Sequence, residues 1–177
     1  NNQACLRLPG IDGKAKMSKS LGNCIYLSDN PEEIRKKIMS MYTDPLHLQV
    51  SDPGHVEGNT VFTYLDAFCK PEHFRQYCPD YSCLDEMKNH YRRGGLGDVK
   101  IKKFLNAVLQ EELEPIRARR TVWEKDIAGV YEILKAGSSA ARQAAAETLD
   151  EVKRAMKINY FEDTSLIREQ AARYENT

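Results

Sequence analysis

Apolar side chains recur at helical intervals along most of this sequence, and this periodicity restricts its fold more than any other feature. The pattern starts at Asn30-Pro31-Glu32-Glu33, where an N-cap asparagine, a proline in the first turn and two acids predict a helix start. The predicted buried stripes are Ile34, Ile38 and Met41; Val61, Phe62, Leu65 and Phe68; and Ile101, Phe104, Leu105, Val108, Leu109, Leu113 and Ile116. We therefore predict a mainly α fold, with a helical bundle over residues 29–177.

Prolines, glycines and capping residues divide this helical part. Two Asp-Pro pairs predict a loop over residues 43–58. Asp98 is expected to cap the longest helix, and Pro115 is expected to kink it because proline lacks a backbone donor. Gly137 is predicted to end the next helix, and Ser139 to start an alanine-rich one.

Residues 1–28 differ from the rest of the chain. Short apolar segments flank a polar loop that runs from Gly10 to Gly22. A stretch of this length cannot bury its own apolar side chains, so we expect it to belong to a larger domain. The predicted organisation is the end of one domain over residues 1–28, followed by a helical domain over residues 29–177.

Composition excludes several classes of function. Lysine plus arginine and aspartate plus glutamate both total 26, so nucleic-acid binding would have to use a local basic surface. Neither a membrane-length apolar run nor a signal-peptide pattern is found, which predicts a cytoplasmic protein without a membrane partner.

Cysteine and histidine usage predicts neither disulfides nor a metal site. The five cysteines are an odd number at irregular spacing, and Cys69, His73, Cys78 and Cys83 contain no C-x2-C pair. None of the four histidines has an evident acid partner in the sequence, so no catalytic histidine is expected.

The segment from Asp12 to Asn23 is the candidate chemical site. It carries three lysines (Lys14, Lys16 and Lys19) together with two hydroxyls and two glycines. Lysine charges and exposed backbone donors suit a polyphosphate, whereas composition alone favours an ordinary solvated basic turn. The absence of G-x-x-x-x-G-K-[ST] excludes a P-loop of the Walker type.

The order Lys16-Met17-Ser18-Lys19-Ser20, continued by Leu-Gly-Asn, resembles the signature loop of the class I aminoacyl-tRNA synthetases. The resemblance implies that these five residues contact the phosphates of ATP, which is bound with Mg²⁺. It further implies that Lys16 and Lys19 are catalytic, since they would stabilise the pyrophosphate leaving group during amino-acid activation.

Downstream segments narrow the resemblance to one branch of these enzymes. Residues 33–44 (EIRKKIMSMYTD), residues 52–54 with 59–61, and the pair GLGDVK at 95–100 and LEPIR at 113–117 resemble tryptophanyl-tRNA synthetases. The tyrosyl enzymes share the last pair and remain the alternative. The resemblance implies that residues 1–28 are a remnant of an α/β Rossmann-type catalytic domain.

The same resemblance implies that the helical domain binds the tRNA anticodon. The candidate tRNA-binding residues are Lys100, Lys102, Lys103, Arg117, Arg119 and Arg120. Lysine and arginine are also the normal surface of a helix. Trp123 and Tyr131 could be core residues between helices or platforms on which bases stack.

The implied partners belong to a full-length enzyme: tryptophan, ATP and tRNA(Trp), with a homodimer whose contacts lie mostly outside this chain. Because the His-Ile-Gly-His type signature is absent here, we expect the isolated chain to be inactive and monomeric. The alternatives are a stand-alone RNA-binding module derived from a synthetase, and a helical protein whose loop resemblance is accidental.

Overall fold

The structure is a computed structural model that describes residues 7–175. Cys5 lies outside the described residues. Contacts within the chain divide it into two compact units, one ending at Thr121 and the other beginning at Val122.

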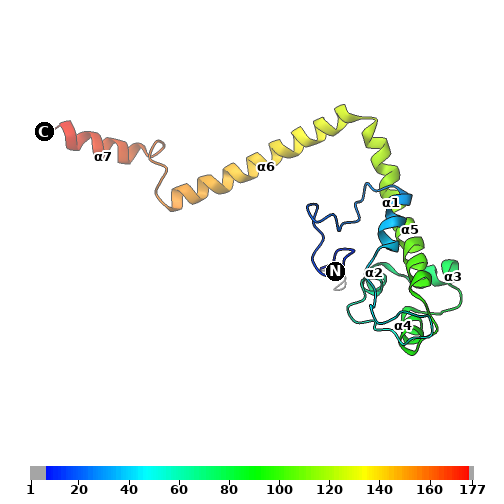
Figure 1. The fold of residues 1–177 in the computed structure, drawn as a ribbon. Coiled ribbons are helices and arrows are strands. Elements are labelled where there is room, and N and C mark those ends of the chain that lie inside the picture. Colours follow the sequence, from blue (N-terminus) through cyan, green and yellow to red (C-terminus); the bar gives the residue numbers. More distant parts are fainter. Residues whose placement is uncertain (1–6, 176–177) are drawn as a thin grey trace. The chain divides into compact units, whose positions relative to one another are not determined.

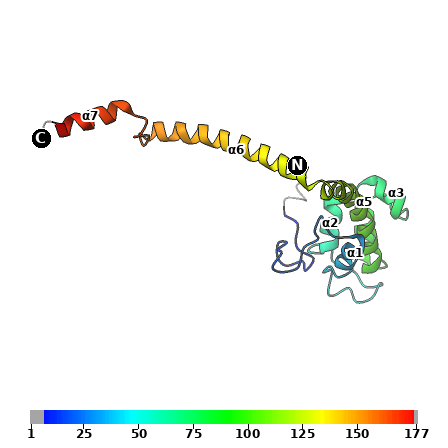
Figure 2. The same ribbon diagram turned by 90° about the horizontal axis from the view of Figure 1, so that it is seen from above.

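The first unit contains a group of short helices beside one long helix. These are α1 (Pro31–Met39), α2 (Thr60–Phe68), α3 (Pro71–Tyr77), α4 (Leu84–Arg93) and α5 (Asp98–Glu124). Figures 1 and 2 show α1, α2 and α3 beside α5. No helix lies between α1 and α2, which confirms the loop predicted over residues 43–58.

The start of α1 matches the prediction in detail. The backbone N–H of Glu33 donates to Asn30 Oδ1 (2.9 Å), and the N–H of Asn30 donates to the Glu33 carboxylate (2.9 Å). This reciprocal pair forms a capping box, in which two otherwise free backbone donors are satisfied. Ile34 and Ile38 are then fully buried on the inner face of the helix.

The core of the first unit forms from the predicted stripes together with α3, α4 and the segment before α5. Phe74, Met87, Tyr91 and Leu96 join the apolar residues of α1, α2 and α5 in one cluster. Tyr91 is fully buried, and its ring packs edge-on against Phe62 with centroids 5.1 Å apart. The buried stripes of the sequence are confirmed, with Phe68 and Ile116 packed at the margin of the cluster.

Asp98 begins α5 but does not act as the expected cap. It is the first residue of the helix, and its carboxylate accepts hydrogen bonds from the Thr43 hydroxyl (2.6 Å) and the Tyr91 hydroxyl (2.8 Å). The carboxylate is therefore used to join the loop after α1 to α4. Further along, α5 continues through Pro115.

The second unit begins within the last turn of α5 and contains α6 (Ile127–Ala155) and α7 (Thr164–Glu175), and no described residue of α6 or α7 is buried. The Asp126 side chain caps α6 by accepting from the N–H of Gly129 (2.9 Å). The predicted break at Gly137 and start at Ser139 are wrong, because α6 runs through both positions. A single glycine costs only about 1 kcal/mol in a helix, and the alanines and leucines around it are strong helix formers.

Trp123 and Tyr131 are not core residues in this structure. Their exposed fractions are 46% and 68%. Over the described residues, no helix combines the length and the apolar character that crossing a membrane requires.

Candidate functional site

The predicted chemical loop is closed at its base by backbone pairing. Pro9 and Lys16 form an isolated antiparallel bridge, and the N–H of Gly10 donates to the carbonyl of Ala15 (2.7 Å). The N–H of Ile11 donates to the carbonyl of Asn23 (3.0 Å). No strand forms among residues 7–28, so the Rossmann-type remnant stays a prediction.

One buried side chain lies at the centre of this loop. Asn23 is only 3% exposed, and its Oδ1 accepts from the N–H of Ser18 (2.8 Å). Its Nδ2 donates to the carbonyl of Lys16 (3.3 Å) and to both carboxylate oxygens of Asp12 (3.2 and 3.3 Å). The backbone on both sides of Met17 is thereby bonded to a single amide.

Two tyrosines attach the loop to the helical body. The Tyr64 hydroxyl on α2 donates to the carbonyl of Pro9 (2.7 Å) and lies 3.6 Å from the sulfur of Met17. Burial of the ring, with a smaller contribution from Cys24, raises the pKa of Tyr64 to about 12, so the hydroxyl keeps its proton at neutral pH. The backbone N–H of Tyr42 donates to the carbonyl of Ile11 (2.8 Å).

The charged groups of the loop face solvent. Lys14, Lys16 and Lys19 are exposed, and none of them forms an ion pair with a residue that the structure describes. The Ser18 and Ser20 hydroxyls lie 2.9 Å apart. Ammonium groups without a carboxylate partner, on a backbone fixed by hydrogen bonds, can receive an anion without first breaking an ion pair.

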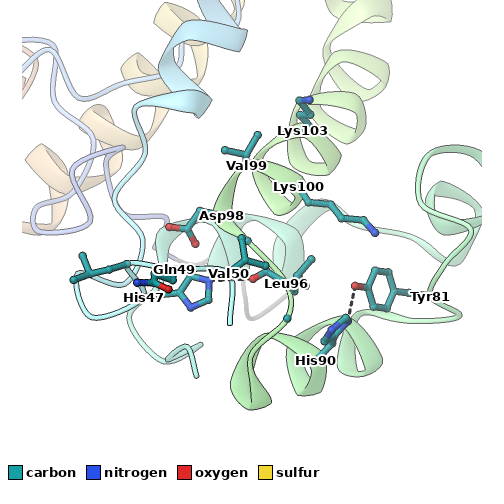
Figure 3. Close-up of a pocket in the computed structure, with 13 residues that line it drawn as sticks. His47, Gln49, Val50, Tyr81, His90, Leu96, Asp98, Val99, Lys100 and Lys103 are labelled. Atoms are coloured by element: carbon teal, nitrogen blue, oxygen red, sulfur yellow. Dashed lines mark hydrogen bonds between the residues drawn. The ribbon is translucent and has the colours of Figure 1, made fainter. Parts of the chain in front are cut away.

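A second site lies where α5 begins. An open pocket of about 610 Å³ is lined by His47, Leu48, Gln49, Val50, Tyr81, His90, Gly95, Leu96, Gly97, Asp98, Val99, Lys100 and Lys103 (Figure 3). The Tyr81 hydroxyl and His90 Nδ1 are hydrogen bonded at 2.8 Å, and the Lys100 ammonium lies 5.3 Å from the centre of the Tyr81 ring. The pocket therefore combines aromatic rings, basic side chains and the N-terminus of a long helix.

The structure brings only two of the six predicted tRNA-binding residues to this pocket. Lys103 is exposed at its edge, whereas Lys100 is paired with Asp80 at 2.7 Å. Lys102 is half-buried and donates to the carbonyl of Met39 (3.1 Å), and this burial lowers the pKa of its ammonium. Lys102 thus supports the packing of α1 on α5.

The three arginines lie near the other end of α5. Arg117 is mostly buried and donates to Glu114 (2.6 Å) and to Gln110 (3.1 Å), while Arg119 and Arg120 are exposed. Seventeen residues of helix separate Lys100 from Arg117, which is about 25 Å at 1.5 Å per residue. The six candidates therefore do not form a single patch.

The expectation that the histidines lack acid partners is wrong for two of them. His55 Nδ1 lies 2.7 Å from the Asp44 carboxylate, and buried His73 lies 3.7 Å from Glu111. Asp44 also accepts backbone hydrogen bonds, so His55 belongs to a loop network. These pairings are long-range contacts, which spacing in the sequence cannot show.

The four cysteines that the structure describes are free thiols. Cys24, Cys69, Cys78 and Cys83 form no disulfide, and burial raises the pKa of the Cys69 thiol to about 12. Within residues 7–175, no group of three or more histidine, cysteine or acidic side chains is placed to hold a metal ion.

Sequence reasoning missed the residues that shape the loop. Asp12 and Asn23 are the two ends of the predicted segment but were given no role, and Tyr64 was not predicted at all; in the structure Asn23 and Tyr64 bond to the signature residues and Asp12 bonds to Asn23. Asn23 follows the signature residues, but nothing in its position shows that its side chain turns inward. Tyr64 matches an ordinary apolar helical pattern, and only its hydroxyl distinguishes it.

Comparison with known proteins identifies the family of this chain. Residues 4–114 match the family described as class I tRNA synthetases (W and Y), so the chain belongs to this family. Among its relatives, the tryptophan–tRNA ligase of Clostridium longisporum is 63% identical over 155 residues, which are 88% of this chain and 43% of the relative. The tryptophan–tRNA ligase of Streptococcus mutans is 57% identical over 160 residues, 90% of this chain and 45% of the relative.

A solved structure is also similar. Tryptophanyl-tRNA synthetase from Campylobacter jejuni, complexed with ADP and tryptophan, superposes with a TM-score of 0.64 at 26% identity, over 85% of this chain and 43% of that one. The chain spans less than half the length of the relatives it matches. Its close relatives are thus aminoacyl-tRNA synthetases, and what this chain contributes to such an enzyme is a separate question.

Proposed function

We propose that this chain is the C-terminal part of a tryptophan–tRNA ligase, in which it supplies the loop for the ATP phosphates and a surface for the tRNA anticodon. The observation that carries the proposal is the state of Lys16 and Lys19. Both ammonium groups face solvent without an ion pair to a described residue, on a loop held by Asn23 and Tyr64. Exposed ammonium groups without a carboxylate partner can bind an anionic ligand directly.

Activation joins the tryptophan carboxylate to the α-phosphate of ATP and releases pyrophosphate. Lys19, and secondarily Lys16, would neutralise the negative charge that grows on the leaving pyrophosphate. Met17, Ser18 and Ser20 would line the contact with the phosphates, where the serine hydroxyls can donate. Removal of one such preorganised donor costs roughly 3 kcal/mol, about a hundredfold in rate.

Mg²⁺ would be held mainly by the ATP phosphates and not by side chains of this chain. The lysine side chains of the loop are not ligands for a divalent cation, and its one carboxylate, Asp12, is hydrogen bonded to Asn23; Mg²⁺ is normally held by phosphate oxygens, water and one or two carboxylates. The ion would arrive with the ATP phosphates and offset part of their charge. No residue of this chain is assigned to it.

The pocket at the start of α5 is the proposed contact with the anticodon. Unpaired bases are bound by stacking on aromatic rings and by contacts to their edges, while lysines hold the phosphates. Tyr81, His90 and His47 form the wall of the pocket, and Lys103 supplies an exposed charge, with Lys100 available once its exposed pair with Asp80 opens. Lys102 is not proposed as a contact because its ammonium is engaged with Met39.

The remaining partners follow from the same proposal. Identity of 63% and 57% to tryptophan–tRNA ligases supports tryptophan over tyrosine as the amino acid. The complete enzyme is proposed to be a cytoplasmic homodimer, since aminoacylated tRNA is consumed by translation there. The dimer contacts are expected to lie mostly outside this chain.

The proposal is tested by tryptophan-dependent ATP–pyrophosphate exchange in the complete gene product. Lys19→Ala should lower the exchange rate about a hundredfold and Lys16→Ala somewhat less, while tRNA(Trp) affinity stays within about twofold. Lys14→Ala is the matched control, because it removes a neighbouring exposed lysine outside the signature. Equal losses for all three variants, or loss of tRNA binding in place of activation, would contradict the assigned roles.

The chain itself provides a complementary test. Residues 1–177 contain neither a His-Ile-Gly-His type signature nor a Walker loop, so on their own they should show no exchange activity above background. A normal synthetase rate from these residues alone would show that the loop is not one part of a larger site.

A further inference from the structure

The loop that carries Lys16 and Lys19 takes its shape from Asn23, which lies three residues after Ser20. Asn23 binds the loop backbone at two points, through the carbonyl of Lys16 and the N–H of Ser18. Its own backbone carbonyl accepts from the N–H of Ile11 on the opposite side of the loop. A single buried residue therefore connects both sides of the loop to the signature segment.

The orientation of this amide is determined by its charged neighbour. An ionised carboxylate only accepts hydrogen bonds, so the Asn23 nitrogen must face Asp12 and the Asn23 oxygen must face the N–H of Ser18. Asp12 is itself held in its charged form. Although desolvation raises the pKa of Asp12, hydrogen bonds from Asn23 and from the backbone N–H groups of Lys14 and Ala15 outweigh it and lower the pKa.

The surrounding backbone leaves room for this side chain and little else. A Cβ atom at Gly10 would lie 2.1 Å from Asn23 Nδ2, which is far inside van der Waals contact. Gly10 is buried, and the amide packs directly against its Cα. The asparagine thus fills a site that the chain forms with a glycine on one side and a carboxylate on the other.

We infer that Asn23 is a positioning residue, whose buried amide, oriented by Asp12, holds the backbone at Lys16 and Ser18 so that the loop presents its lysines in one fixed shape. This inference rests on the proposed function, because the lysines are the groups that act. It assigns Asn23 no contact with substrate. Asn23 would affect the reaction by keeping the loop lysines in place. Donors that are already in position need no rearrangement when negative charge develops on the leaving pyrophosphate.

The test uses the complete gene product and two measurements. Hydrogen–deuterium exchange of the peptide spanning residues 16–23 reports the backbone of the loop, and ATP–pyrophosphate exchange gives kcat and the KM for ATP. Asn23→Ala should speed deuterium uptake in that peptide at least tenfold and lower kcat at least tenfold, with a KM change of less than threefold. The control is Asn30→Ala, which removes the α1 cap, and so lowers stability, but has no contact with the loop.

A charge exchange separates positioning from simple loss of stability. Asn23→Asp places a second carboxylate against Asp12 and should impair kcat at least as much as Asn23→Ala. In the double variant Asp12→Asn with Asn23→Asp, an amide again faces a carboxylate and the Ser18 N–H keeps its carboxylate acceptor, while the carbonyl of Lys16 stays without its donor. The kcat of the double variant should be at least fivefold higher than that of Asn23→Asp. Its deuterium uptake should also be slower, closer to the rate of the unsubstituted protein.

Three results would overturn the inference: unchanged deuterium uptake in Asn23→Ala, faster uptake with unchanged kcat, or a double variant no better than Asn23→Asp. Failure of the proposed function looks different, because the unsubstituted protein would then lack exchange activity before any variant is made. The deuterium measurement still decides in that case whether Asn23 holds the loop.

Discussion

The Tyr64 hydroxyl donates to the carbonyl of Pro9 across 2.7 Å, although 55 residues separate the two in the chain. The same hydroxyl lies 3.6 Å from the sulfur of Met17 inside the signature loop. This one group on α2 therefore fixes the start of the loop and touches its centre. The loop is therefore joined to the helices of the first unit by side-chain hydrogen bonds as well as by the continuous backbone.

Replacing Tyr64 with phenylalanine tests that connection. The ring stays, but a half-buried carbonyl loses its donor, so the free energy of unfolding should fall by about 1 kcal/mol. The activation rate of the complete gene product should fall as well. Tyr42→Phe is the control, since no hydrogen bond to the Tyr42 hydroxyl is seen among the described residues. Equal unfolding midpoints for the two variants in urea would argue against the role given to Tyr64.

We expect some basic residues of α5 to contact tRNA and others to stabilise helix packing. Lys103→Ala is expected to weaken tRNA(Trp) binding several-fold and to reduce the slope of log affinity against log salt by roughly 0.7 to 1, as for one lost phosphate contact. Lys102→Met should leave affinity and slope unchanged, because its ammonium is bonded to Met39. Fluorescence titration of tRNA at several salt concentrations measures both quantities. A larger effect at Lys102 than at Lys103 would show that the RNA approaches another face.

Two glycines of the loop allow the stability cost of a steric clash to be measured separately from the cost of backbone strain. Gly13 and Gly22 have φ values of +70° and +64°, so alanine is strained by about 1 kcal/mol at either position. At Gly13 the added Cβ would also lie 2.7 Å from Thr60 Oγ1, whereas at Gly22 it meets nothing within 4 Å. Gly13→Ala should therefore destabilise by at least about 1 kcal/mol more than Gly22→Ala in urea unfolding. Similar losses would mean that Thr60 moves aside freely.

Acid should weaken the first unit through Asp44. Desolvation raises the pKa of this carboxyl, but hydrogen bonds from the N–H groups of Leu46 and His55 and from the His55 ring outweigh it, and the net pKa lies below the ordinary 3.8. The folded state then binds fewer protons than the unfolded state near that value. Its contribution to stability is complete above about pH 3.8 and is lost as pH falls through the lowered pKa.

The check is urea unfolding between pH 7 and pH 3, with Asp44→Asn for comparison. The substitution should lower stability at neutral pH by about 1–2 kcal/mol and flatten its decline below pH 4. A decline of unchanged steepness in Asp44→Asn would place the acid sensitivity elsewhere in the unit.

Much of the helical body could be predicted from local patterns. Asn30 and Pro31 start α1 where the sequence indicates, and the stripe from Ile101 to Leu113 is buried. Caps and helical stripes depend on residues within a few positions of each other, so a single sequence carries their signal. The break at Gly137 failed because one glycine costs too little to stop an otherwise favourable helix.

The sequence by itself indicated the buried helical stripes of α1, α2 and α5 and the lysine loop that resembles a synthetase signature. Only the tertiary structure decided that Asn23 turns inward, that Tyr64 reaches Pro9, and that Lys102 supports packing while Lys103 stays free at the pocket. The physical reason is the range of the interactions. Propensity and capping act between neighbours along the chain, whereas burial and side-chain hydrogen bonds join residues that only folding brings together.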